Sequence, residues 1–226
     1  MKRIGILCAS DTELNPFFQY IQSPQITEKA MLKFYSGRIL ENEIVAVYSG
    51  VCKVNAAIAA QLLIDLFHVD SMINAGTAGG INQDVCLFDT VISERMIYHD
   101  VAEDILTEFH PWLKENCFQA DRELYAAAQQ YTCQSDFPIL FGTMVTGEQF
   151  VEDEKRAAIH QKYAPLSVDM ETVSVAHVCY VNSIPFLSVR TITDTATHKG
   201  VEHFEQNCKL ASERAAKIVI GILQQL

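Results

Sequence analysis

The 226-residue sequence lacks clusters of Lys and Arg, linkers rich in Pro, Gly or Ser, internal repeats, and apolar runs of membrane-spanning length. It has 17 Lys and Arg against 28 Asp and Glu, a formal net charge of −11. Generic binding to nucleic acid or to acidic lipid is therefore disfavoured, because phosphate contacts need clustered cations. The short apolar run near the N-terminus stops too early for a signal peptide. We expect a cytoplasmic protein that binds neither nucleic acid nor membranes.

The cysteines form no C-x-x-C pair, and their number, seven, is odd. This pattern predicts free thiols in a reducing compartment, with no disulfide framework and no zinc ribbon. The histidines show no metal-ligand spacing such as H-x-x-x-H. No metal and no cofactor is therefore expected.

The composition, 49% hydrophobic and 20% charged residues, is that of an average globular protein. Without a linker or repeat, residues 1–226 are predicted to form a single domain. Short runs of branched apolar residues alternate with longer amphipathic stretches. The predicted strands are Arg3–Cys8, Ile44–Ser49, Ser71–Ala75, Thr90–Ile97, Ile139–Val145, Leu166–Met170 and Phe186–Thr193. The predicted helices are Lys53–Phe67, Asp121–Tyr131, Asp153–Tyr163, Glu171–Asn182 and His203–Gln225.

This alternation predicts an α/β fold with a largely parallel sheet covered by helices on both faces. In such folds ligands bind beyond the carboxyl ends of the strands. Two segments after early strands are therefore candidates. Ser10–Glu13 has the spacing of a helix capping box, which is the simpler interpretation of that segment alone. The glycines of Asn74–Gly80 suit either a tight turn or close approach of the backbone to a ligand.

Three later candidates also follow predicted strands. Phe150 could stack on a flat ligand or simply fill the core. Glu171 and Asp194 are separated by one helix and one strand. Right-handed crossover geometry then puts both carboxylates at the same edge of the sheet. Either acid alone could simply interact favourably with the dipole at a helix N-terminus. Two acids together with Glu13 and the glycines indicate one site.

The whole chain resembles the 5′-methylthioadenosine/S-adenosylhomocysteine nucleosidases of the nucleoside phosphorylase/hydrolase superfamily. The resemblance implies a three-layer α/β/α sandwich with a mixed, largely parallel central sheet, and a homodimer. The segments that carry the resemblance occur in family order: the N-terminal strand with Glu13, Ser49–Ala57, Asn74–Gly80, Tyr98–Asp100, Val145–Val151, Val168–Glu171 and Val189–Asp194.

The family's enzymes cleave the N-glycosidic bond of an adenine nucleoside, releasing adenine and the free pentose. By resemblance, Asp194 is the acid that protonates or hydrogen-bonds adenine N7, and Glu13 activates the attacking water. Glu171 binds the ribose hydroxyls and favours the cationic sugar. The other substrate-binding positions implied are Met170, Phe150, Val151, Thr77, Val51 and Phe204. Supporting roles fall to Gly79, Thr193 and Arg190, of which Arg190 is expected to hold a carboxylate rather than touch substrate.

The sequence departs from the family pattern at the 5′ end of the substrate. Ser10 stands where relatives have Met, and Cys52 where they have Gly. The segment that normally supplies apolar residues carries Glu103, Asp104 and Glu108. Burying such carboxylates unpaired would be costly. Either the register shifts, or the acids face solvent, or the 5′ group is more polar than methylthio.

Two other functions remain open from the sequence. A phosphorylase of the same superfamily would use phosphate in place of water, and phosphate needs Arg or Lys. By resemblance, such phosphorylases carry arginines in two loops. The first, Ser10–Glu13 here, has neither Arg nor Lys, and the second, Cys52-Lys53 here, offers only Lys53, which we expect to be solvated. A nucleoside-binding protein without catalysis is the third possibility, because fold alone does not fix function. Retention of all three acids favours the hydrolase.

Overall fold

The computed structural model describes residues 2–198 and 200–226. Met1 and Lys199, which fall inside the predicted domain, lie outside the described residues. The strands are β1 (Arg3–Cys8), β2 (Gln22–Lys29), β3 (Leu32–Ile39), β4 (Asn42–Tyr48), β5 (Ser71–Gly80), β6 (Thr90–Tyr98), β7 (Phe118–Gln119), β8 (Ile139–Thr146), β9 (Ser167–Asp169) and β10 (Phe186–Asp194). The helices are α1 (Asp11–Leu14), the 3-10 turn η1 (Asn15–Phe17), α2 (Lys53–Asp65), α3 (Ile105–Glu108), α4 (Arg122–Thr132), α5 (Asp153–Tyr163), α6 (Thr172–Val181) and α7 (Gly200–Leu223).

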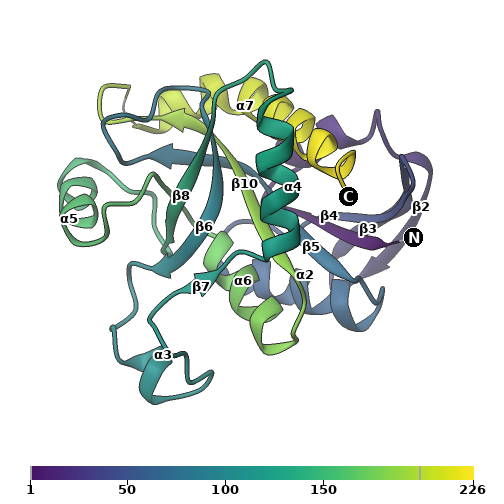
Figure 1. The fold of residues 1–226 in the computed structure, drawn as a ribbon, viewed down its shortest axis with the longest axis horizontal. Helices are drawn as coiled ribbons and strands as arrows, with labels where there is room; N and C mark the ends of the chain where they lie inside the picture. Colours follow the sequence, from purple (N-terminus) through teal and green to yellow (C-terminus); the bar gives the residue numbers. More distant parts are fainter. Residues whose placement is uncertain (1, 199) are drawn as a thin grey trace.

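The strands form one mixed sheet in the order β10-β6-β8-β9-β5-β1-β4-β3-β2 (Figure 1). Strand β5 pairs in parallel with both β1 and β10, so these three strands end at the same edge. Strand β10 also pairs with β6, which closes β5, β9, β8, β6 and β10 into a ring. The short strand β9 runs antiparallel to β5, with Val168 opposite Gly79, so its last residues lie beside the end of β5. The carboxyl ends of β1, β5, β9 and β10 therefore meet in one place.

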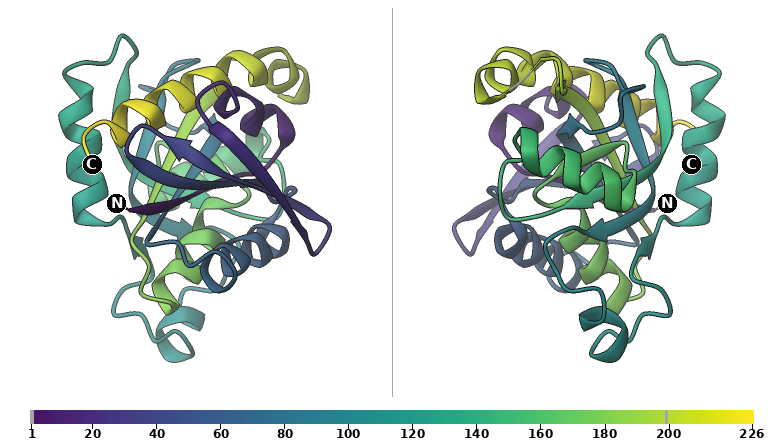
Figure 2. Two further views of the ribbon diagram at one scale, coloured as in Figure 1. Left: turned by 90° about the vertical axis from the view of Figure 1, so that its right-hand side faces the viewer. Right: turned by 90° about the vertical axis from the view of Figure 1, so that its left-hand side faces the viewer.

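Helices cover both faces of the sheet, as Figures 1 and 2 show. Helices α1, α4 and α7 pack on one face and contribute to one apolar cluster. Helices α2 and α6 pack together on the opposite face and contribute to a second cluster. All nine residues of β10 are buried, as expected for a strand covered on both sides. The predicted three-layer fold is confirmed.

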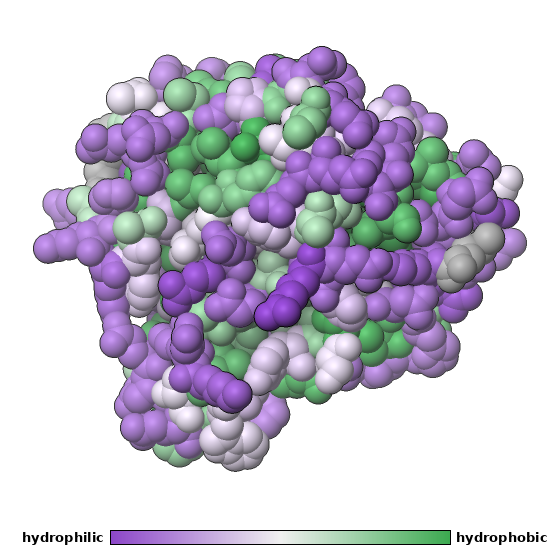
Figure 3. Space-filling view, viewed as in Figure 1, coloured by the Kyte–Doolittle hydropathy of each residue, from purple (hydrophilic) through white to green (hydrophobic). Residues whose placement is uncertain are grey.

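The outer surface of α4 is mostly polar. Helix α4 buries Leu124, Ala127 and Ala128 at helical spacing and presents its other residues outward. The face of the molecule in Figure 3 is accordingly mostly hydrophilic, with hydrophobic patches between. Within the described residues, no helix combines the length and the apolar character needed to cross a bilayer.

The short strand β7 was not predicted, and two larger features of the sheet also differ from the sequence prediction. The sequence predicted a strand that ends at Ala75, with the glycines after it. Instead, β5 continues through these glycines to Gly80 as a ten-residue strand. The hairpin of β2 and β3 was not predicted at all. Every residue of β2 is exposed, so β2 lacks the alternation of apolar and polar residues that identifies a half-buried strand.

Candidate active site

A cavity of about 260 Å³ lies where the carboxyl ends of β1, β5, β9 and β10 meet. Every site residue predicted from the sequence lines this cavity except Arg190, which lies buried beneath it. The lining residues are Ala9, Ser10, Glu13, Val51, Thr77, Ala78, Gly79, Gln149, Phe150, Val151, Val168, Asp169, Met170, Glu171, Thr193, Asp194, Val201 and Phe204. Residues far apart in the sequence thus come together at one sheet edge, as the strand order requires.

Glu13 both completes a helix capping box and lines the cavity. The Ser10 hydroxyl accepts from the Glu13 N–H and the Glu13 carboxylate accepts from the Ser10 N–H, so the capping box is present. The same carboxylate is 4% exposed and also accepts from Ala9 N–H at 2.7 Å. From β5, the Thr77 N–H and hydroxyl donate to Oε1 at 2.7 and 2.9 Å. The carboxylate is therefore held from two strands at the cavity wall.

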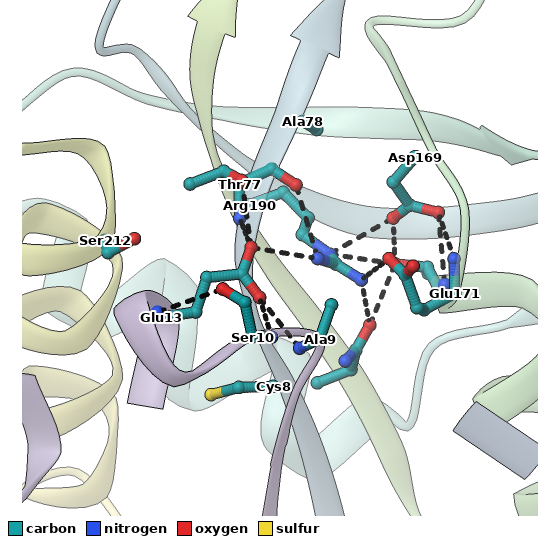
Figure 4. Close-up of polar contacts among 12 residues, drawn as sticks. Cys8, Ala9, Ser10, Glu13, Thr77, Ala78, Asp169, Glu171, Arg190 and Ser212 are labelled. Atoms are coloured by element: carbon teal, nitrogen blue, oxygen red, sulfur yellow. Dashed lines mark hydrogen bonds and ion pairs between the residues drawn. The ribbon is translucent and has the colours of Figure 1, made fainter. Parts of the chain in front are cut away.

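Arg190 organises the acidic wall of the cavity (Figure 4). Its fully buried guanidinium lies 3.1 Å from Asp169, 3.4 Å from Glu171 and 3.8 Å from Glu13. Burial alone would lower the pKa of Arg190, but the three carboxylates raise it above its ordinary value. The guanidinium is therefore a permanent cation that holds three anions in place.

Two residues of this wall were missed by the sequence analysis. Asp169 accepts from Thr146 and Thr172 hydroxyls and from the Glu171 and Thr172 N–H groups at 3.2 and 3.1 Å. Asn74 accepts from Arg190 Nη2 at 2.6 Å. Asp169 stands two residues before Glu171, just ahead of the predicted helix. An acid in that position can accept from the free N–H groups of the first helical turn, and this could have identified Asp169 from the sequence.

The pKa of Glu171 is raised above its ordinary value. Burial raises its pKa to about 7, and the neighbouring anions Asp169 and Glu13 act in the same direction. The Arg190 cation and the Cys52 N–H, which donates to Oε1 at 2.9 Å, oppose this rise. Glu171 therefore exchanges its proton near neutral pH, inside the cavity.

Asp194 ends β10 at a different part of the cavity and is 1% exposed. Thr193 Oγ1 donates to its Oδ1 at 3.0 Å, and Arg156 Nη2 donates to its Oδ2 at 2.8 Å. A Cβ built on Gly79 would lie 3.0 Å from Oδ2, so a larger residue there would crowd the carboxyl group. Arg156 was also missed by the sequence analysis. It lies in a run of charged residues, and no pattern in that run indicates which side chain faces the interior.

Apolar side chains line the space between the acids. Phe150 and Phe204 meet edge to face with ring centroids 6.3 Å apart. Val51, Val151 and Met170 also line the cavity. The Glu13 carboxylate lies against Gly76 of β5 and the Asp194 carboxylate against Gly79. Both acids line the cavity together with these apolar side chains.

The acidic segment that departs from the family pattern, residues 103–108, does not line the cavity. Glu103, Asp104 and Glu108 are exposed, and Glu103 pairs with Lys162 at 2.8 Å. Of the alternatives drawn from the sequence, the structure favours the one in which these acids face solvent. The expectation that Lys53 is solvated is wrong, because its side chain is only 19% exposed and its Nζ lies 2.9 Å from Asp100 Oδ1.

No group of three His, Cys, Asp and Glu side chains in the described part of the chain is placed to hold a metal ion. The seven cysteines are free thiols.

Comparison with known proteins identifies the family. The model of the "Phosphorylase superfamily" matches residues 3–224. The 5′-methylthioadenosine/S-adenosylhomocysteine nucleosidase of Pseudoalteromonas translucida is 34% identical over 99% of this chain and 97% of its own. The S-adenosylhomocysteine nucleosidase of Streptococcus pyogenes, solved with 5-methylthiotubericidin, is 26% identical, with TM-score 0.92 over 100% of this chain and 97% of its own. The nucleosidase of Colwellia psychrerythraea, solved with adenine, is 28% identical, with TM-score 0.90 over 100% and 96%. The chain therefore belongs to the phosphorylase superfamily and, within it, to the 5′-methylthioadenosine/S-adenosylhomocysteine nucleosidases, as the resemblance predicted.

Proposed function

We propose that this protein hydrolyses the N-glycosidic bond of 5′-methylthioadenosine, S-adenosylhomocysteine or a related 5′-modified adenosine, giving adenine and the free pentose. The observation that carries this proposal is the placement of the two carboxyl groups of Glu13 and Asp194 in the lining of one cavity. Glycoside hydrolysis needs an acid at the leaving group and a base on the other face of the sugar.

Glu13 activates the attacking water. Its carboxylate is fixed by Ala9 and Thr77, so it is aimed before substrate binds. As the bond to adenine breaks, water adds to the anomeric carbon and gives its proton to Glu13. Thr77 Oγ1 lies 2.9 Å from the same carboxylate oxygen and is placed to contact this water.

Asp194 acts on the leaving base. Transfer of its proton to adenine N7 lets the base depart as a neutral molecule rather than as an anion. Phe150 stacks on the adenine ring, and the Val151 backbone contacts the edge of the base. Phe204, whose ring meets that of Phe150, completes this apolar end.

Glu171 stabilises the sugar as it becomes cationic. The side chain lies beside Met170 and accepts hydrogen bonds from the ribose hydroxyls. A carboxylate held in a buried site interacts strongly with an oxocarbenium-like sugar, because little water screens the charge. Arg190 keeps this carboxylate and that of Glu13 in place without facing the cavity.

The cavity lining supports water over phosphate as the nucleophile. Among the described residues that line the cavity, none is Lys or Arg. Arg190, which lies buried beneath the cavity, is already surrounded by three carboxylates. A phosphate dianion beside Glu13 would meet repulsion and no free cation.

Product analysis tests the proposal. The protein is incubated with 5′-methylthioadenosine, S-adenosylhomocysteine, adenosine, inosine and 5′-deoxyadenosine, each with and without phosphate. We expect free adenine and free pentose without phosphate, and loss of adenine release in Asp194→Asn. A strict phosphate requirement would instead establish the phosphorylase. An Asp194→Asn variant of full activity would refute the assignment of the acid.

The assembly and compartment are part of the same proposal. Val51 lines the cavity yet is 48% exposed, and Val54 and Ile58 continue this exposed apolar strip along α2 at 68% and 45%. A second copy covering this strip would complete the 5′ end of the cavity in a symmetric homodimer. Light scattering at micromolar concentration that gives a monomer mass would refute this assembly. Seven free thiols suit a cytoplasmic location.

A further inference from the structure

Helix α5 turns one charged side chain inward. Glu154, Lys155, Ala157 and Ala158 are exposed, whereas Arg156 is 6% exposed and Ile159 is buried. Burying a guanidinium carries a large desolvation cost unless its ion pairs and hydrogen bonds compensate for it. An apolar residue at position 156 would anchor the helix at lower cost, so the charge calls for a further explanation.

The contacts of Arg156 join three parts of the active site. Nη2 donates to Asp194 Oδ2 at 2.8 Å and lies 3.5 Å from the Val151 carbonyl, and Nη1 donates to the Gly80 carbonyl. Gly80 ends β5 and Asp194 ends β10, while Val151 belongs to the end of the cavity that takes the base. The guanidinium fork thus spans the acid and both segments beside it.

The Asp194 carboxyl group is held at both oxygens. Thr193 Oγ1 donates to Oδ1 at 3.0 Å, and Arg156 holds Oδ2. With one anchor the group could rotate about its Cβ–Cγ bond; with two, its plane is fixed. A base whose N7 must meet a carboxyl oxygen in a set direction needs this orientation before it binds.

We propose that Arg156 is a positioning residue for the acid step. It orients the Asp194 carboxyl group toward N7 of the departing adenine and ties that orientation to the segment at Val151. The inference rests on the proposed function, because it assumes that Asp194 protonates the base. Arg156 itself touches no substrate, because it does not line the cavity. Asp194 and Val151, which it contacts, line the cavity in front of it.

The test separates an effect through Asp194 from a general effect on the base-binding end. Variants Arg156→Gln and Arg156→Lys are compared with wild type and with Lys162→Gln, a charge-matched control on the exposed side of α5. For each, kcat and KM for 5′-methylthioadenosine are measured from adenine release. The Kd is measured for 5′-methylthiotubercidin, in which a carbon replaces N7. This analogue fills the same site but offers Asp194 no nitrogen.

We expect Arg156→Gln to lower kcat about 100-fold, the size of effect that a misplaced catalytic group produces, with KM changed far less. Its Kd for the analogue should stay within about threefold of wild type, because the contact to N7 is absent in both. Arg156→Lys should recover part of kcat, because it keeps the cation but not the fork.

A wild-type kcat in Arg156→Gln would overturn the inference. So would an analogue Kd that weakens by the same factor as kcat falls, because Arg156 would then shape the base-binding end as a whole. If Arg156→Gln does not fold, as judged by thermal unfolding, Arg156→Lys carries the same comparison. If the wild-type protein releases no adenine, the proposed function fails, and that result is distinct from any difference between variants.

Discussion

The Glu13 carboxylate packs directly against the backbone of Gly76 in β5. A Cβ built on Gly76 would lie 2.7 Å from Glu13 Oε2, closer than real Cβ contacts allow. The neighbouring Thr77 N–H can therefore reach Oε1 at 2.7 Å. The glycine is needed here for the close approach of a side chain to a strand, and β5 remains regular at this position.

This relationship predicts the effect of Gly76→Ala. The new methyl group displaces the Glu13 carboxylate and breaks its bonds to Thr77, so kcat should fall about 100-fold. Gly5→Ala is the matched control, because its Cβ would meet Leu63 at 3.2 Å, away from the cavity. Adenine release and thermal unfolding are measured for both. Full activity in Gly76→Ala would show that the position of Glu13 does not matter.

Replacement of Arg190 should destabilise the fold strongly. Arg190→Met leaves Glu13, Asp169 and Glu171 buried without their cation, which costs about 3–5 kcal/mol in the free energy of unfolding. Arg38→Met removes the same side chain from an exposed pair with Glu41 and should cost less than about 1 kcal/mol. Urea denaturation measures both. Equal losses in the two variants would contradict this account of the acidic wall.

The stability of the protein should depend on pH through Glu171. Burial raises its pKa from an ordinary value of 4.5 to about 7, so between these pH values the folded state binds more protons than the unfolded state. The stabilisation from this proton is complete below pH 4.5 and is lost as pH rises to 7. The loss is about 3 kcal/mol for a shift of this size.

Glu171→Gln isolates this dependence. The variant carries no titrating group at position 171, so its free energy of unfolding should fall less than that of wild type from pH 4.5 to 8. Above pH 7 the variant should be the more stable protein. Urea denaturation at several pH values measures the difference, and parallel curves for the two proteins would disprove the raised pKa.

The sequence predicted the layers and the cavity because strong local patterns determine them. Strand β1 is a continuous apolar run after Arg3, and Glu13, Glu171 and Asp194 each follow or end a strand. Arg156 and Asn74 could not be assigned in this way, because their roles depend on contacts between segments distant in sequence. The β2–β3 hairpin escaped prediction because β2 buries none of its residues.

The backbone at Cys52 provides the last prediction. Cys52 has φ +80° and ψ 164°, a conformation that only glycine adopts without strain, and its N–H donates to Glu171 at 2.9 Å. Cys52→Gly keeps this N–H and relieves a strain of about 1–3 kcal/mol, so thermal unfolding should occur at a higher temperature. Cys52→Ala removes the thiol but keeps the Cβ, and therefore the strain, which makes it the matched control. If the two variants unfold at the same temperature, the Cβ at position 52 is not the source of strain. If only Cys52→Gly is stabilised and its kcat is unchanged, the wild-type protein keeps the hydrogen bond to Glu171 at the expense of backbone strain, which glycine relieves.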